Sequence, residues 1–295
     1  MKNVLITGGA GFIGSNLACK LINLGFNVTI LDNLSPQIHG GNPEKSSFTF
    51  KSAINAGVRF IEGTVTDKDD WIKALDAQDA VIHLAAETGT GQSMYEIQKY
   101  VDVNIGGTAI LLDLLANTPH TIKKIIVASS RAIYGEGKYN CINHGYVYPE
   151  ARADADMKNK HFECKCPHCG SELELMPTDE ASKIHPTSLY GLTKQAQEEM
   201  VLMIGKSLGI PAVAFRQRRQ RLHPHLPRRA DLLQQQRQPA ADQPARRLHH
   251  RHVAPEWTDP ARADDCQFLR PVLQADQREH GGLRRGQPVP VPHES

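Results

Sequence analysis

Short runs of apolar, β-branched residues recur along the first 216 residues and alternate with segments that favour helix. The runs are Asn3–Thr7, Asn27–Leu31, Val58–Glu62, Ala80–Leu84, Lys124–Ser129 and Ala212–Phe215. The helix-like segments between them include Gly14–Leu24, Lys68–Leu75, Asn104–Ala116 and Tyr190–Leu208. Near-continuous apolar strands suit a sheet covered on both faces, and the alternation favours parallel strands with right-handed crossovers. The pattern predicts an α/β doubly wound parallel sheet of the Rossmann type.

The composition shows an uneven distribution of charge along the chain and indicates a cellular location. The chain has 295 residues, 40% of them hydrophobic, and is long enough to bury a sizeable core. Its net charge of +2 hides an asymmetry, because residues 217–295 hold fourteen Arg and nine acids and residues 1–216 are mildly acidic. No apolar run approaches the roughly 20 residues that cross a bilayer, and the N-terminus lacks a secretory signal. We expect a cytoplasmic protein with no membrane partner.

The glycine-rich start carries the cofactor prediction. A predicted strand runs into Gly8, Gly11 and Gly14, a helix follows, and Asp32 closes the next strand. Such glycines permit a tight turn, a close approach to a pyrophosphate and close packing of helix on strand, while the acid grips a ribose diol. A carboxylate repels a 2′-phosphate, so NAD is favoured over NADP; turn glycines with no ligand are the alternative. Three neighbouring residues are assigned to the same cofactor site: Phe12, Ile13 and Asn33.

The segment "SLYGLTK" carries the candidate chemistry. Tyr190 and Lys194 are one helical turn apart, so their side chains share a face. An ammonium beside a phenol stabilises the phenolate and makes the tyrosine a general acid and base. The alternative is that Tyr190 and Lys194 are an ordinary pair on a helix surface. This alternative is disfavoured only because the chain also contains the N-terminal glycines and "VASSRAIYG".

Together these motifs resemble the extended short-chain dehydrogenase/reductases that act on nucleoside-diphosphate sugars. The likeness runs from Met1 to about Arg216 through "TGGAGFIG", "HLAA", "VNIGGT", "SSRAIYG" and "YGLTK". It implies that Ser130 hydrogen-bonds the sugar hydroxyl being oxidised, beside Tyr190 and Lys194. It also implies that the cofactor is lined by Leu84, Ala85 and Ala86. Where the family has an acid that holds adenine, this chain has Thr64; Val65 is still expected on the ring, and Asp67 suits a helix cap equally well.

The resemblance narrows the reaction. Dehydratases of this family carry Asp-Glu after the catalytic hydroxyl residue, whereas this chain has Arg131-Ala132. Epimerisation at C4, by transient oxidation and re-reduction of a nucleoside-diphosphate sugar, is therefore favoured, and a homodimer is a further implication. A dehydratase or reductase on the same scaffold and a noncatalytic NAD-binding sensor stay open as alternatives.

Residues 137–181 form an insertion with metal-ligand spacing. Cys141, His144, Cys166 and Cys169 read C-x2-H-x21-C-x2-C, and two such chelating pairs can close a tetrahedral zinc site of structural type. Cys164 and His168 are competing ligands, and His161 is a weaker one. A reduced metal-free loop and a redox dithiol are the alternatives. The insertion resembles that of the subgroup that includes dTDP-L-rhamnose 4-epimerases.

The sequence changes character after Arg216. The family continues with Tyr-x-Asn-Val-Tyr-Gly-Pro, whereas this chain has "QRRQRLHP" and then no Lys, Ile, Asn, Tyr or Met. Those five residues share A/T-rich codons, which indicates a frameshift; a genuine basic tail is the alternative. Residues 217–295 are expected to be a disordered Pro/Gln/Arg-rich tail in place of the substrate lobe. Interleaved Pro and acids, with few aromatics, make it a poor nucleic-acid module, so no specific nucleic acid is expected.

Overall fold

The computed structural model describes residues 1–42 and 47–216. The expectation of a disordered tail that replaces the substrate lobe concerns residues 217–295, which lie outside the described residues.

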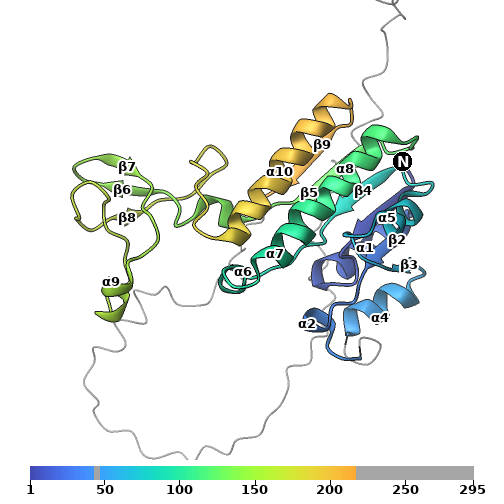
Figure 1. Cartoon of the computed structure of the whole chain (residues 1–295), viewed down its shortest axis with the longest axis horizontal. Coiled ribbons are helices and arrows are strands. Elements are labelled where there is room, and N and C mark those ends of the chain that lie inside the picture. The colour runs from blue at the N-terminus through green and yellow to red at the C-terminus, as the bar shows by residue number, and fades with distance from the viewer. Residues whose placement is uncertain (43–46, 217–295) are drawn as a thin grey trace, which may run out of the picture. The chain divides into compact units, whose positions relative to one another are not determined.

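A six-stranded parallel sheet forms the centre of the fold, in the order β3-β2-β1-β4-β5-β9 (Figure 1). The strands are β1 (Asn3–Thr7), β2 (Asn27–Asp32), β3 (Arg59–Glu62), β4 (Ala80–His83), β5 (Lys124–Ala128) and β9 (Ala212–Phe215). The central strand β1 pairs with β2 on one side and β4 on the other, and Val4 lies between Val28 and Ala80. The chain reverses its direction of progress across the sheet at this point, where ligands bind in open α/β folds. The predicted doubly wound sheet is confirmed.

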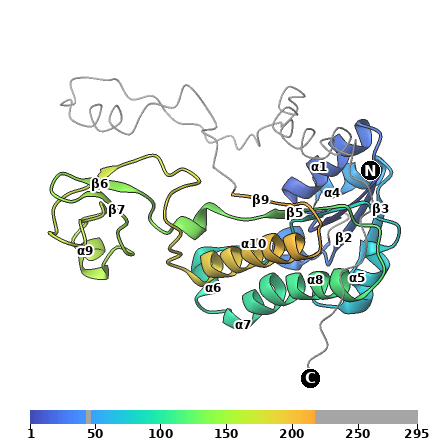
Figure 2. The same cartoon turned by 90° about the horizontal axis from the view of Figure 1, so that it is seen from above.

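Helices cover both faces of the sheet (Figure 2). The helices of the main domain are α1 (Phe12–Asn23), α2 (Pro36–His39), α4 (Phe48–Asn55), α5 (Lys68–Leu75), α6 (Thr90–Ser93), α7 (Ile97–Tyr100), α8 (Gly107–Asn117) and α10 (Leu189–Ser207), whereas α9 (Asp154–Lys158) lies in the insertion (Figure 2). Strand side chains alternate between two buried clusters. Val4 and Ile6 of β1 pack on the side of α1, whereas Leu5 packs on the side of α5, α8 and α10. This two-faced burial is why the strands read as continuous apolar runs.

Helix boundaries differ from the prediction in two places. Helix α1 begins at Phe12 and not at Gly14, and a π-helical turn, η1 (Val101–Gly106), precedes α8. Asp67 is the N-cap of α5, because its Oδ1 accepts hydrogen bonds from the backbone N–H groups of Asp69 and Asp70. None of the helices in the described part of the chain is long and apolar enough to cross a lipid bilayer.

A second, three-stranded antiparallel sheet lies within the insertion. It has the order β7-β6-β8 and is built from β6 (Tyr139–Cys141), β7 (Gly145–Val147) and β8 (Glu174–Leu175). Its small core contains Tyr139, Val147 and three buried cysteines, Cys141, Cys164 and Cys166. The insertion begins after the 3-10 turn η2 (Arg131–Tyr134) and ends before α10. It therefore joins the two elements that carry the candidate catalytic residues.

Candidate active site and metal centre

The glycine-rich loop lies at the carboxyl end of β1, where the sheet order reverses. Gly8 has φ of +65°, and a Cβ there would lie 2.7 Å from the backbone nitrogen of Ala85, so a side chain is excluded. Gly11 is the N-cap of α1, and no side chain caps the first N–H groups of this helix. Phe12 is 76% exposed and Ile13 lies beside it at the open end. A bare helix start behind a glycine turn fits the pyrophosphate of a dinucleotide.

Asp32 ends β2 beside this loop and is 8% exposed. Its Oδ2 accepts a hydrogen bond from Ala10 N (3.0 Å), and its Oδ1 accepts one from Leu34 N (2.9 Å). His39 Nε2 lies 3.7 Å from Oδ1. Each carboxylate oxygen has a second lone pair, so Asp32 can hold the loop and still accept from a ribose hydroxyl.

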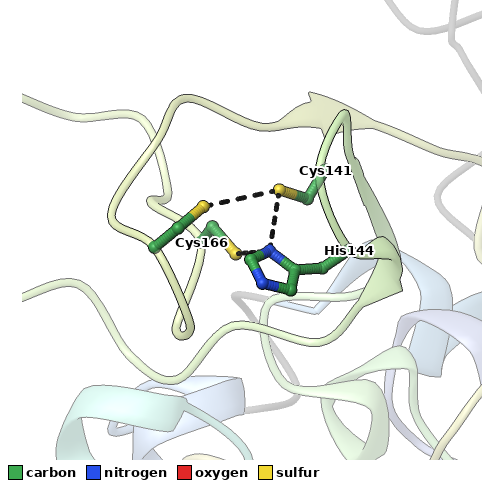
Figure 3. Close-up of side chains that lie close together, drawn as sticks. Cys141, His144 and Cys166 are labelled. Atoms are coloured by element: carbon green, nitrogen blue, oxygen red, sulfur yellow. Dashed lines mark hydrogen bonds between the residues drawn. The ribbon is translucent and has the colours of Figure 1, made fainter.

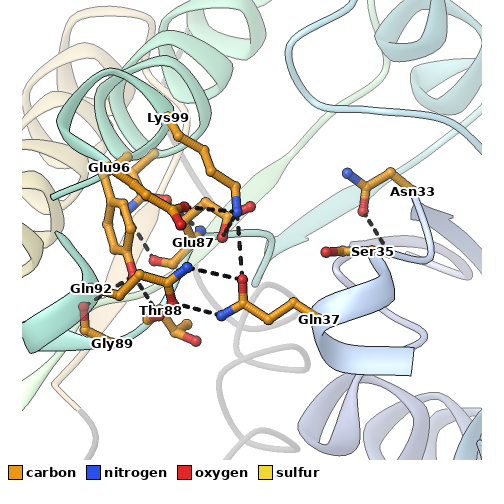
Figure 4. A network of polar contacts seen from close by, with 11 residues as sticks. Asn33, Ser35, Gln37, Glu87, Thr88, Gly89, Gln92, Glu96 and Lys99 are labelled. Atoms are coloured by element: carbon orange, nitrogen blue, oxygen red, sulfur yellow. Dashed lines mark hydrogen bonds and ion pairs between the residues drawn. The ribbon is translucent and has the colours of Figure 1, made fainter. Parts of the chain in front are cut away.

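The segments that follow β2 and β4 are tied together by side chains of α2, α6 and α7 (Figure 4). Gln37 of α2 donates its Nε2 to Gln92 Oε1 of α6 (2.7 Å), and Gln92 Nε2 donates to Gln37 Oε1 (3.1 Å). Lys99 of α7 pairs with Glu87 and Glu96, both at 3.2 Å. The segment after β4, which begins with the predicted residues Leu84–Ala86, is thereby connected to the segment that follows Asp32.

Ser130 and Tyr190 lie on elements that touch. Ser130 follows β5 and caps η2, and its Oγ accepts a hydrogen bond from Ala132 N (3.1 Å). Tyr190 is in the first turn of α10, which contacts η2. A Cβ on Gly191 would lie 2.6 Å from the carbonyl oxygen of Ala132, so only glycine permits this approach. The hydroxyl of Ser129 is buried and has no hydrogen-bond partner among the described residues, so a ligand that reaches it would satisfy it.

Lys194 is 2% exposed on α10. Its Nζ donates a hydrogen bond to Gln197 Oε1 (2.5 Å). Burial lowers the pKa of Lys194 to about 7. Gln197 was not among the residues predicted from the sequence. The feature that could have indicated it is a polar residue three positions after the lysine, on the same buried side of the helix.

Asn104 is a second residue that the motif reading left without a role. It is buried in η1, its Oδ1 accepts from Glu87 N (2.8 Å), and its Nδ2 donates to Glu87 O (3.2 Å) and Thr193 Oγ1 (3.0 Å). It therefore ties the loop after β4 to α10 beside Lys194. Single π turns occur frequently at functional sites.

Arg216, the last described residue, follows β9 and connects it by hydrogen bonds to α10 and to η2. Its guanidinium donates to both carboxylate oxygens of Glu198 (2.6–3.2 Å), to the hydroxyl of Tyr134 (2.7 Å) and to the carbonyl of Glu180 (3.1 Å). The hydrogen bonds to Glu198 are the first cause that raises the pKa of Arg216 above its ordinary value.

Val65 lies at the margin of the buried core. It is 5% exposed and belongs to the core cluster, and a Cβ on Gly107 would lie 2.7 Å from its Cγ2. Asp70, which sequence reasoning passed over, accepts a hydrogen bond from Thr64 N (3.0 Å), which is the first cause that lowers the pKa of Asp70.

The four residues with metal-ligand spacing converge in the insertion (Figure 3). The donor atoms of Cys141, His144, Cys166 and Cys169 lie within 4.8 Å of one another. Cys141 Sγ is 3.5 Å from His144 Nδ1 and 3.7 Å from Cys169 Sγ, and Cys166 Sγ is 3.7 Å from the same Nδ1. Cys164 is buried near this group but is not one of the four. The cluster is thus the one that the spacing predicted.

Neighbouring groups favour the thiolate form at Cys141 and Cys169, two of the three cysteines in this cluster. Hydrogen bonds, first from His144 and then from Ser171, lower the pKa of Cys141 to about 5. Hydrogen bonds from Ser171 lower the pKa of Cys169 to about 7, whereas burial raises the pKa of Cys166. Ser171 Oγ lies 3.0 Å from Cys169 Sγ and 3.6 Å from Cys141 Sγ. Thiolates are the form that binds metal.

The fold and the glycine-rich loop define a nucleotide-binding domain of the Rossmann type. Residues 4–151 match the sequence profile of the NAD dependent epimerase/dehydratase family, and the chain belongs to this family. A dTDP-L-rhamnose 4-epimerase of Burkholderia thailandensis is 34% identical over 203 residues, which cover 68% of this chain and 53% of that protein. A bifunctional UDP-glucose and UDP-xylose 4-epimerase of Pisum sativum is 35% identical over 137 residues, 46% of this chain and 38% of that protein.

Solved structures show the same likeness. The UDP-glucose 4-epimerase from Brucella ovis in complex with NAD has a TM-score of 0.52 at 29% identity, covering 73% of this chain and 51% of that one. The UDP-glucose 4-epimerase from Thermotoga maritima with UDP-glucose has a TM-score of 0.51 at 28% identity, covering 72% and 54%. The chain spans about half the length of the curated relatives it matches.

Proposed function

We propose that this chain derives from an NAD-dependent nucleoside-diphosphate-sugar 4-epimerase. The observation that carries the proposal is the contact between η2 and α10, which brings Ser130 and Tyr190 onto touching elements beside the glycine-rich loop. Arg131 and Ala132 occupy η2 where a dehydratase needs an acid pair. Relatives named as 4-epimerases of UDP- and dTDP-sugars support this substrate class.

The residues have separate parts in the proposed reaction. Gly11 leaves room for the pyrophosphate, Gly8 and Gly14 let the loop pack closely against Ala85 and Gly9, and Asp32 accepts from the adenosine ribose. Bound NAD would supply the acceptor and later the donor of the C4 hydride, so that the sugar could be reduced again on its other face. Tyr190 accepts the proton of the C4 hydroxyl and gives it back, Ser130 orients that hydroxyl, and the Lys194 ammonium stabilises the phenolate.

The proposed domain boundaries follow from the same residues. Residues 1–216 form the NAD-binding domain, with the insertion at 137–181 inside it, and a frameshift has placed 217–295 where relatives carry their substrate lobe. Sequencing the coding DNA around codon 216 tests this, because restoring one frame is expected to recover "NVYGP"-like sequence. Recovery of no such sequence in either alternative frame contradicts the frameshift.

Turnover of the restored-frame protein tests the reaction. With UDP-glucose or dTDP-L-rhamnose in D2O, we expect the C4 epimer without deuterium at C4, since the hydride returns from the bound cofactor. Tyr190→Phe is expected to lower kcat by at least about 100-fold, and Tyr95→Phe, at an exposed position, serves as the control. Loss of water to a 4-keto product instead indicates a dehydratase, and NAD binding without turnover indicates a sensor. The 295-residue chain itself is expected to turn over negligibly.

We further propose that Cys141, His144, Cys166 and Cys169 hold a structural zinc. A tetrahedral site with arms of about 2.3 Å to sulfur and 2.0 Å to nitrogen has edges of about 3.8 Å between sulfurs and 3.5 Å between sulfur and nitrogen. Three of the six separations, 3.7 Å between sulfurs and 3.5–3.7 Å between sulfur and nitrogen, support this assignment, and all six lie within 4.8 Å. Four protein ligands leave no open position, so the metal would close the insertion that joins η2 to α10.

A homodimer and a cytoplasmic location remain proposals of the same kind. The family resemblance supports the first, and sedimentation over a range of protein concentrations tests it. A reducing compartment would keep the cluster's thiols available to metal, which supports the second; fractionation of cells that express the chain tests it.

A further inference from the structure

A buried chain of polar side chains runs from Lys194 on α10 to β1 and the loop after β4. Gln197 accepts from Lys194 Nζ (2.5 Å), and its own Nε2 donates to Thr108 Oγ1 (2.8 Å) and lies 3.2 Å from His83 Nε2. His83 Nδ1 lies 2.7 Å from Thr7 Oγ1, which accepts from the backbone nitrogen of Ala85 (3.2 Å). All of these side chains are buried. The chain links the lysine to the segment assigned to the cofactor.

The hydrogen bonds of Thr108 fix the direction of the Gln197 amide. Thr108 donates its own proton to Asn104 O (2.6 Å), so its Oγ1 accepts from Gln197 Nε2 (2.8 Å). An amide NH2 can only donate, so the carbonyl of Gln197 is the end that faces Lys194. His83 carries a single ring proton, because burial, and then the charge of Lys194, lower its pKa to about 3. Its Nε2 lies 3.2 Å from Gln197 Nε2 and 3.1 Å from Thr108 Oγ1.

Lys194 depends on this carbonyl. No carboxylate among residues 1–42 and 47–216 forms an ion pair with it, and its burial disfavours the ammonium. Of the titratable groups around it, His83 on β4 is neutral and Tyr190 is on its own helix. Glu87 on the loop after β4 pairs with Lys99, and Glu198 pairs with Arg216. Asn104 of η1 and Thr108 of α8, which bond Thr193 and Gln197 on the same helix as Lys194, carry no charge.

We propose that Gln197 is the positioning residue of the active-site lysine: anchored by Thr108 beside His83, its carbonyl holds the Lys194 side chain at one place and favours its charged form over the neutral amine. The role rests on the function proposed above, because a charged lysine is what stabilises the Tyr190 phenolate. Helix α10 and strand β4 are far apart in sequence and are connected at this point through Gln197. A leucine at 197 would fill the same space without an acceptor.

The test measures the titration of Lys194 directly. The 295-residue chain is labelled with [13Cε]lysine, and the Lys194 signal is identified by its loss in Lys194→Arg. Gln197→Met, which removes the acceptor at similar volume, is expected to lower the NMR titration midpoint of Lys194 by about one to two pH units, the scale of a hydrogen bond to a charged group. Gln197→Glu is expected to raise the midpoint by a similar amount.

Gln195→Met is the matched control, since Gln195 lies on the exposed side of the same helix and bonds Glu199. It should leave the midpoint unchanged. A midpoint in Gln197→Met equal to that of the unchanged chain overturns the proposal. If that variant does not fold, a failure of Gln197→Glu to raise the midpoint overturns it equally. Because this readout needs neither NAD nor a sugar, it separates an error about Gln197 from an error about the reaction.

Discussion

Gly191 provides a direct test of the packing that brings the catalytic elements together. In Gly191→Ala the new Cβ would lie 2.6 Å from the backbone oxygen of Ala132 and 3.0 Å from Cβ of Pro186, although real Cβ contacts shorter than 3.0 Å are essentially never seen. A main-chain carbonyl cannot rotate away as a side chain can. Helix α10 or η2 must therefore move by about 0.4 Å or more, which displaces Tyr190 from Ser130.

The expected cost is that of an overpacked core, about 1–3 kcal/mol. Alanine is also the better helix former by about 1 kcal/mol, which partly offsets the clash. Gly91→Ala is the control, because Gly91 is helical in α6 with nothing within 4 Å of the added Cβ and carries the same propensity gain. The difference between the two variants isolates the clash.

Thermal unfolding of the 295-residue chain, followed by circular dichroism, measures this difference. A domain of this size loses about 2–4 °C of Tm per kcal/mol, so Gly191→Ala is expected to melt about 2–12 °C below Gly91→Ala. In the restored-frame enzyme kcat should also fall, since an ångström of misplacement costs on the order of 100-fold. Equal melting temperatures for the two variants would refute the view that close approach of α10 to η2 requires glycine.

Three further predictions concern the cofactor, the metal and the buried lysine. NAD is expected to bind more tightly than NADP by calorimetry, and Asp32→Ala should abolish the preference; equal affinities in the unchanged chain contradict the role of Asp32. The purified chain should carry about one zinc by elemental analysis, released by Cys166→Ser but retained in Cys164→Ser; a metal-free chain prepared without chelator counts against the site. The pKa of Lys194 is lowered to about 7 in the folded chain, against about 10.4 for an unfolded lysine. Between these two values the unfolded state binds the proton and the folded state does not, so the free energy of unfolding falls as the pH falls from about 10 to 7. Lys194→Met should remove that slope and raise Tm more at pH 7 than at pH 10; parallel pH profiles would show the lysine to be solvated.

Much of the fold and part of the candidate site could be read from local sequence. The six strands of the parallel sheet were predicted within a residue or two, because strands buried on both faces must be apolar along their length, whereas the three short strands of the insertion were not predicted. The glycines near Gly8 were visible for a similar reason, since a turn against Ala85 leaves no room for a Cβ. The ligand set of the insertion was readable because each chelating pair is close in sequence. The ambiguity between Cys166 and Cys164 needed the structure, since spacing does not show which thiol faces the cluster.

The tertiary structure alone decided how the active-site lysine is held. Gln197 and His83 are 114 positions apart, and no periodicity links an amide on one helix to an imidazole on a distant strand. The same holds for Asn104, which joins Glu87 to Thr193, and for the pair of Gln37 with Gln92. Hydrophobic burial is a property of single residues and leaves a periodic trace in the sequence, so it determines the elements. A polar network depends on the relative positions of several elements after they pack, and it therefore exists only in the folded chain.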